Sequence, residues 1–140
     1  MKEYSYGICP YRIRKYRTEI MLIQAKGHDV WGFIKGKIDT NETIQECAKR
    51  ETKEETNIKF KKKHLEDYYV QHNKKKDVGI FLIDEVNLDL SNIILEEREI
   101  QKIKFFDLMK LKDEMINKNQ TQILNKIKDK FSKRIYYFSN

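Results

Sequence analysis

The segment 42–56 constrains the fold of this chain more than any other stretch, because its apolar and acidic residues share one helical face. At about 100° per residue, a helix here places the apolar side chains of its first half on one side: Ile44, Cys47 and Ala48. The same side continues in three carboxylates: Glu51, Glu54 and Glu55. The first half of such a helix packs on a core, and the acids of its second half need a partner.

Carboxylates at i, i+3 and i+4 repel one another unless a cation joins them, and acids are almost never buried alone. A hard divalent cation such as Mg²⁺ binds carboxylate, water and phosphate oxygens, so a magnesium site is one explanation. A solvated surface helix, with Lys49 and Lys53 on its outer side, is the other explanation that the pattern alone allows.

Two neighbouring residues bear on that choice. Arg50 lies one turn from Glu46 and from Glu54, where it can orient a carboxylate or form an ordinary helix salt bridge. Gly36 stands in a basic stretch before the helix, where glycine permits close approach to a ligand or a positive φ. A loop of this kind that leads into a helix N-terminus can bind phosphate, although this pattern alone is not specific.

The rest of the chain predicts strands separated by polar turns. We expect strands at residues 7–13, 19–25, 30–34, 65–72, 78–86 and 100–106. A loop is expected at 36–41, a turn of helix at 107–112, and a second helix at 120–133 with the apolar stripe Ile123, Leu124, Ile127 and Phe131. This interleaving predicts an α/β fold in which a mixed sheet is sandwiched between helices, α/β/α.

Length and composition favour one globular domain over residues 1–140. The chain has no apolar run of about 18 residues and no signal-peptide pattern near Met1, so we expect a cytoplasmic protein with no membrane partner. Cys9 and Cys47 are too few and too far apart to suggest a disulfide scaffold or a zinc site. The net charge of +7 suits a polyanionic partner such as a nucleotide, or can reflect solvated lysine runs such as Lys61–Lys63 and Lys74–Lys76.

The spacing around the acidic helix resembles the Nudix box. That box reads G, five residues, E, seven residues, then R-E-U-x-E-E-x-G-U, where U is a bulky aliphatic residue. The positions that match in register are Gly36, Glu42, Arg50, Glu51, Glu54, Glu55 and Ile58. Thr52 departs from the aliphatic residue and Asn57 from the glycine. Asn is the next best residue for a left-handed helix end, so we expect a positive φ at Asn57.

The resemblance implies a role for each matched residue. Glu51, Glu54 and Glu55 would bind Mg²⁺, with Mn²⁺ as a substitute, and the carbonyl of Gly36 would add a ligand. Arg50 would orient a glutamate, Glu42 would support the loop, and Glu54 and Arg50 would belong to the catalytic set. In the reaction, water attacks a phosphoanhydride phosphorus, the metal neutralises charge, and a carboxylate takes the proton.

Many family members have a further glutamate just before the strand equivalent to residues 103–106. Glu99 lies six residues before Phe105, the spacing seen in the diadenosine tetraphosphate and RNA pyrophosphohydrolase groups, and is our candidate for this catalytic acid. Glu96 and Glu97 are the alternatives.

The resemblance leaves several substrates open, all of them nucleoside polyphosphates. Residues 31–38 look like the segment that leads into the Nudix box in diadenosine tetraphosphate hydrolases and mRNA-decapping enzymes, with Ile34 in place of a proline. Lys35 and Lys37 can contact extra phosphates. The aromatic residues that can stack on a base, or simply pack in the sheet, are Trp31, Tyr68, Tyr69 and His72.

Dinucleoside polyphosphates such as diadenosine tetraphosphate are the first choice of substrate. The 5′ end of RNA, triphosphorylated or capped, is second, and a damaged nucleoside triphosphate is third. A Nudix module that binds a nucleotide or RNA without cutting it is an alternative of another class, against which the complete set of acids argues. The oligomeric state and the number of metal ions stay open.

Overall fold

The computed structural model describes the backbone of residues 1–139 and the side chains of residues 1–133. Asn140, the last residue of the range expected for the domain, lies outside the described residues. The strands are β1 (Glu3–Arg14), β2 (Arg17–Ala25), β3 (Trp31–Gly32), β4 (Ile34–Lys37), β5 (Tyr68–His72), β6 (Lys76–Asp84) and β7 (Ile100–Asp107). The α-helices are α1 (Ile44–Thr56) and α2 (Thr121–Ser139), and the short 3₁₀ helices are η1 (Lys62–His64), η2 (Glu85–Asn87), η3 (Leu108–Lys110) and η4 (Asp113–Met115).

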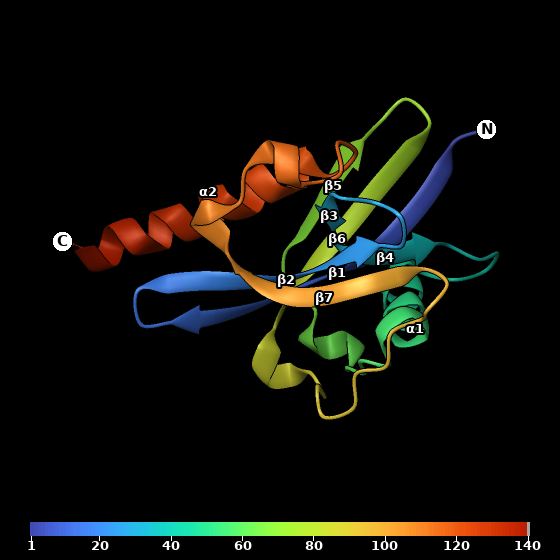
Figure 1. Cartoon of the computed structure of the whole chain (residues 1–140), viewed down its shortest axis with the longest axis horizontal. Coiled ribbons are helices and arrows are strands. Elements are labelled where there is room, and N and C mark those ends of the chain that lie inside the picture. Colours follow the sequence, from blue (N-terminus) through green and yellow to red (C-terminus); the bar gives the residue numbers. More distant parts are fainter. Residues whose placement is uncertain (140) are drawn as a thin grey trace.

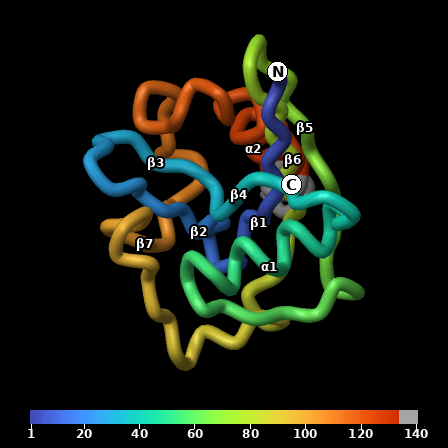
Figure 2. The backbone as a smooth tube through the Cα atoms, turned by 90° about the vertical axis from the view of Figure 1, so that its right-hand side faces the viewer, coloured from blue at the N-terminus to red at the C-terminus, as the bar shows by residue number. Residues whose placement is uncertain are grey.

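The strands form one mixed sheet with α1 and α2 on opposite sides, as Figures 1 and 2 show. Its main path runs β3-β2-β1-β6-β5, while β4 also pairs with β1 and β7 with β2. Only the β1–β6 pair of these strands is parallel. The expected fold, a mixed sheet between helices, is confirmed.

Alternate residues of the central strands supply two separate cores. In β2, Ile20 and Leu22 pack toward α2, whereas Met21 and Ile23 pack toward α1. β6 alternates in the same way, and the stripe predicted on α2 is buried in the α2-side core. A strand with both faces covered reads as a continuous apolar run, which is the pattern seen in its sequence. None of the described helices is long and apolar enough to cross a membrane.

The segment before α1 differs from the expectation. The predicted strand at residues 30–34 is two short strands, β3 and β4, and Gly36 lies within β4 instead of in a loop. Gly36 pairs with Tyr6 of β1, a contact that local sequence does not reveal. Its φ is not positive, since Gly27 is the glycine with a positive φ among the described residues. The glycine at residue 36 therefore has another reason, given below.

The boundaries of α1 follow from its caps. Thr43 is the N-cap: its hydroxyl accepts from the Glu46 N–H at 3.1 Å, and Glu46 Oε1 accepts from the Thr43 N–H at 2.8 Å. This capping box starts the helix at Ile44, two residues later than expected. At the other end Asn57 has φ 61° and ψ 17°, so the predicted positive φ is confirmed. Its side chain adds a hydrogen bond of 2.8 Å to the Asn92 carbonyl.

Candidate functional site

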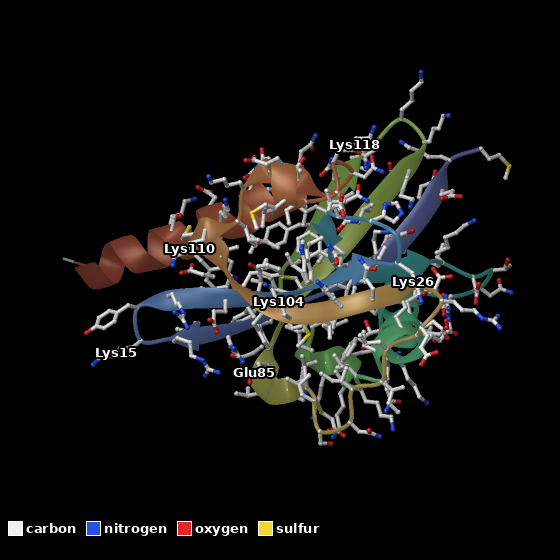
Figure 3. All side chains as sticks on the ribbon, in the orientation of Figure 1. Lys15, Lys26, Glu85, Lys104, Lys110 and Lys118 are labelled. Atoms are coloured by element: carbon white, nitrogen blue, oxygen red, sulfur yellow. The ribbon has the colours of Figure 1, made fainter. Side chains whose placement is uncertain are left out.

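A cleft of about 850 Å³ opens beside the C-terminal half of α1. Its walls come from α1, β4, the start of β6, and the segments 28–33, 96–100 and 117–120. The sequence-predicted residues that line it are Trp31, Lys35, Gly36, Lys37, Glu51, Glu54, Glu55 and Glu99. Lys26, labelled near α1 in Figure 3, lies beside this cleft, because its backbone N–H donates to the carbonyl of the lining residue Glu99 at 2.8 Å.

Gly36 brings β4 into contact with the first acid of the helix. A Cβ atom at Gly36 would lie 1.9 Å from Oε2 and 2.0 Å from Cδ of Glu51. No side chain fits there while Glu51 keeps its position. The Gly36 carbonyl also lies 3.4 Å from Sγ of Cys47, one turn earlier on α1. Glycine thus permits close packing between strand and acid, which explains this residue without any unusual backbone angle.

Arg50 uses all of its N–H groups, some to tie α1 to the segment before it and the others to hold two acids of α1 itself. Its Nε and Nη2 donate to the two carboxylate oxygens of Glu42 at 2.6 and 2.9 Å. Nη1 donates to Glu51 at 2.8 Å and Glu54 at 3.2 Å, and Nη2 also donates to the Lys37 carbonyl at 2.9 Å. Arg50 therefore orients two of the three candidate metal ligands. Glu46, which the sequence also placed within its reach, is occupied in the capping box.

The carboxyl groups of this network differ in their pKa values. The hydrogen bond from Arg50 lowers the pKa of Glu42, whose side chain is only 12% exposed. Burial raises the pKa of Glu51. Burial, and next the charge of Glu51, raise the pKa of Glu55 to about 8. An unpaired acid in such surroundings is destabilised as an anion, so Glu55 is a good ligand for a cation.

The acids of α1 suit a divalent cation, because one of their oxygens is buried without a partner within residues 1–133. Oε2 of Glu55 is buried and has no hydrogen-bond partner in the described part of the chain. Within the described residues, however, no three carboxylate, imidazole or thiol side chains converge into a ready-made metal cluster. Arg50 holds Glu51 at 2.8 Å and Glu54 at 3.2 Å, and the Glu54 side chain is 58% exposed, so it can turn toward a cation by giving up that one hydrogen bond. The carboxylate oxygens of Glu51, Glu54 and Glu55 suit a hard cation, and rotation of the exposed Glu54 side chain would bring them together around it.

Two lysines face these acids from the sheet. Lys35 of β4 is half-buried; burial, and next the charge of Lys76, lower its pKa to about 8. Lys76 comes from the start of β6 and lines the same cleft. The sequence placed Lys76 in a run of solvated lysines at a hairpin tip, and nothing local distinguishes it from Lys74 or Lys75. The parallel β1–β6 pairing brings it into the cleft.

The three candidates for the additional catalytic acid all lie in the segment before β7, but their positions relative to the cleft differ. Glu96 and Glu99 line the cleft, whereas Glu97 is not among the lining residues. The charge of Glu99 contributes to the raised pKa of Glu55, which places Glu99 near the acids of α1. Glu96 lies close too, because its N–H donates to the Glu55 carbonyl at 2.8 Å. Its side chain, however, accepts a hydrogen bond from the Arg98 N–H at 3.1 Å.

The structure brings only one of the candidate aromatic residues to the cleft. Trp31 lines it and makes an edge contact with Phe106, with ring centroids 4.7 Å apart. Tyr69 does not line it; its hydroxyl donates to Asp67 at 3.2 Å and its ring packs on the α2-side core. Tyr68 packs on Phe81 at 4.5 Å, and His72 pairs with Asp77 at 2.9 Å. These three side chains have structural partners in the sheet.

Comparisons with known proteins identify relatives of the whole arrangement. A model of the NUDIX domain matches residues 5–127. Over 104 residues the chain is 33% identical to the m7GpppN-mRNA hydrolase of Saccharomyces cerevisiae, a match that covers 73% of this chain. The match spans only 11% of the length of that yeast protein.

Solved structures share the fold at lower sequence identity. An Ap4A hydrolase from C. elegans superposes with a TM-score of 0.66 at 22% identity, covering 93% of this chain and 98% of the other. The NUDIX domain of Shewanella oneidensis NrtR, complexed with ADP ribose, gives a TM-score of 0.66 at 12% identity, covering 94% of this chain and 89% of the other. Equal fold similarity to proteins with different ligands means that the substrate has to be argued from the cleft.

Proposed function

Because the chain belongs to the Nudix hydrolase family, whose members act on pyrophosphate bonds, we propose that its substrate is two nucleosides joined by a chain of phosphates. Free dinucleoside polyphosphates such as diadenosine tetraphosphate are the first choice. A phosphate chain at the 5′ end of an RNA is the second.

The observation that carries this proposal is the pairing of acids and lysines across one cleft. Glu51, Glu54 and Glu55 stand on the α1 wall, and Lys35 and Lys76 come from β4 and β6. The acids supply oxygen ligands for metal, while the ammonium groups can bind phosphate oxygens that the metal does not reach. A long phosphate chain uses both sets of groups at once.

Mg²⁺, or Mn²⁺ in its place, would be held by Glu51, Glu54 and Glu55 together with the Gly36 carbonyl. When bound, it neutralises phosphate charge and lowers the pKa of a bound water toward neutrality. Arg50 positions Glu51 and Glu54 through Nη1, and Glu42 holds the guanidinium in place from its other side. Glu99, on the opposite wall, accepts a proton from the attacking water.

An RNA 5′ end is favoured by a specific observation. The yeast relative is named for m7GpppN-mRNA, which also places phosphates between two nucleosides, and it is 33% identical over 73% of this chain. The net charge of +7 would attract the RNA body as well as its end.

A single panel tests both substrates. Diadenosine and diguanosine tetraphosphate, capped RNA, 5′-triphosphorylated RNA and a nucleoside triphosphate are incubated with the protein and MgCl₂, and products are resolved by ion-exchange chromatography. We expect metal-dependent cleavage of a dinucleoside polyphosphate, lost in the double variant Glu54→Gln/Glu55→Gln. Faster cleavage of RNA would move the assignment to the second candidate. No cleavage of any compound in the panel would overturn the proposal.

A further inference from the structure

Two side-chain amides, of Gln120 and Asn117, also line the cleft, and the oxygen of each accepts a backbone hydrogen bond. Gln120 is 3% exposed, and its Oε1 accepts a bond of 2.7 Å from the Phe33 N–H. A Cβ at Gly32 would lie 2.8 Å from that Oε1 and 3.1 Å from Nε2, so the glycine leaves room for the amide. Among the described residues, none accepts a hydrogen bond from Nε2 of Gln120.

The second amide belongs to Asn117, three residues earlier. Its Oδ1 accepts from the Asn119 N–H at 2.9 Å, so its Nδ2 is the group left over. The backbone around both amides is fixed: the Asn117 N–H donates to the Trp31 carbonyl, and the Gln120 N–H donates to the Asn117 carbonyl, each at 2.9 Å. Turning either amide over would break the hydrogen bond to its oxygen, so the N–H₂ group of each is the part left to bind a ligand.

We propose that these two amides bind the base of the substrate and select guanine. This inference rests on the proposed function, since it names one nucleoside of that substrate. Guanine presents two neighbouring acceptors, N7 and O6, along one edge. Adenine has a donor, the N6 amino group, in place of O6, and that amino group would face an amide N–H₂. A site whose unpaired amide groups are N–H₂ donors therefore favours guanine over adenine.

The surroundings of the amides suit a base better than a phosphate. Ile23, Val30 and Trp31 line the cleft there, and the amides carry no charge. Lys35 and Lys76 provide the charged alternative for phosphate elsewhere in the cleft. Guanine methylated at N7 has lost one of the two acceptors, so it binds less well here than unmodified guanine.

Nucleoside monophosphates test this inference without any cleavage, because they contain no phosphoanhydride bond. Calorimetric titration with GMP, IMP, 7-deaza-GMP, AMP and CMP is the measurement. GMP and IMP, which share N7 and O6, should bind alike. 7-deaza-GMP and AMP should bind about 5- to 100-fold more weakly, the range expected for a lost hydrogen bond that leaves a buried donor unpaired.

Two nearly isosteric variants replace the amide N–H₂ groups and keep the oxygen that each backbone N–H needs. Gln120→Glu retains an oxygen for the Phe33 N–H, and Asn117→Asp retains one for the Asn119 N–H. Each should reduce the ratio of GMP to AMP affinity about 5- to 100-fold. The control is Gln122→Glu, which makes the same change of charge at an exposed position on α2 outside the cleft and should leave the ratio unchanged.

The result that overturns the inference is a GMP to AMP ratio near one in the wild type, or a ratio that both cleft variants leave intact. Tighter binding of CMP than of GMP would also overturn it. Failure of the proposed function looks different: no polyphosphate is cleaved, whatever the binding ratios are. Thermal melting of each variant verifies that a changed ratio does not come from unfolding.

Discussion

At the scale of single residues, the glutamates of this cleft differ only in their surroundings. Glu42 is matched to a guanidinium, Glu54 is exposed, and Glu55 is buried with one oxygen unpartnered. Glu42 has both carboxylate oxygens paired with the guanidinium, so it is a poorer metal ligand than Glu55. We expect surroundings of this kind to divide identical side chains into positioning groups, metal ligands and a base.

The first prediction concerns the base. Glu99→Gln should lower kcat about 10²–10⁴-fold, the usual cost of losing a general base, with little change in substrate affinity or melting temperature. Glu97→Gln is the matched control, since Glu97 does not line the cleft, and should retain near-full turnover. Glu96→Gln should cost far less than Glu99→Gln. If Glu99→Gln keeps its turnover and Glu96→Gln loses it, the roles of the two acids are reversed.

Asn57 gives a prediction about stability. Asn57→Gly relieves the left-handed conformation, worth about 1 kcal/mol, but loses the hydrogen bond to Asn92, worth a similar amount. The free energy of unfolding in urea should therefore change by less than about 1 kcal/mol. Asn57→Ala loses the bond and increases the strain, and should destabilise the protein by about 2 kcal/mol. Equal stability of the glycine and alanine variants would contradict the role of the backbone angle.

At the scale of elements, β4 and α1 work as a unit because Gly36 lets the strand contact Glu51. In Gly36→Ala the new methyl group would displace the Glu51 carboxylate, which is the flexible end of a side chain. We expect a small change in melting temperature together with a large loss of turnover and weaker Mg²⁺ binding. Calorimetry and steady-state kinetics provide the measurements. A variant that binds Mg²⁺ as the wild type does would show that Glu51 can leave this position without consequence.

The bond between Glu42 and Arg50 joins the preceding loop to α1, and its contribution should depend on pH. The pKa of Glu42 is lowered in the folded state by Arg50, so the contribution is fully present above the unfolded pKa of about 4.3. It is lost as the pH falls through the lower, folded pKa. Glu42→Gln should therefore destabilise the protein by about 1–3 kcal/mol at pH 7, and by much less at pH 3, in urea denaturation. A difference that is the same at both pH values would contradict this assignment.

Local periodicity predicted what lies within one element. The acidic face of α1 and the stripe on α2 depend on neighbours a few residues away, and the structure agrees with both. The resemblance to the Nudix box predicts the left-handed residue at Asn57, and the structure confirms it. The helix begins at Ile44, two residues later than expected, because the capping box of Thr43 and Glu46 fixes its N-terminus. The contact between Gly36 and Glu51, and the entry of Lys76 and Gln120 into the cleft, depend on strand pairing and chain reversal between distant segments. The spacing of Gly36 and Glu51 belongs to the Nudix box, but no spacing in the sequence encodes the positions of Lys76 and Gln120.

At the scale of the whole molecule, the sheet separates two hydrophobic cores, and the cleft lies beside the C-terminal half of α1. α1 contributes its apolar half to one core and its acidic half to the cleft. The other walls come from segments far apart in the sequence, around residues 28–37, 76, 96–100 and 117–120, so the site exists only when the full fold is assembled. Metal binding should then stabilise the folded chain as a whole, by an amount that grows with the logarithm of its concentration.

Glu55 allows this coupling to be tested with two effects of opposite sign. Its Oε2 is buried without a partner among the described residues, so Glu55→Gln should raise the melting temperature in the absence of metal. The same change removes a metal ligand, so the increase in melting temperature that MgCl₂ gives the wild type should be reduced or absent in this variant. Glu114→Gln, at an exposed glutamate outside the cleft, is the control and should alter neither value. A variant that is less stable without metal, yet gains as much from MgCl₂ as the wild type, would show that Glu55 supports the fold and does not bind the cation.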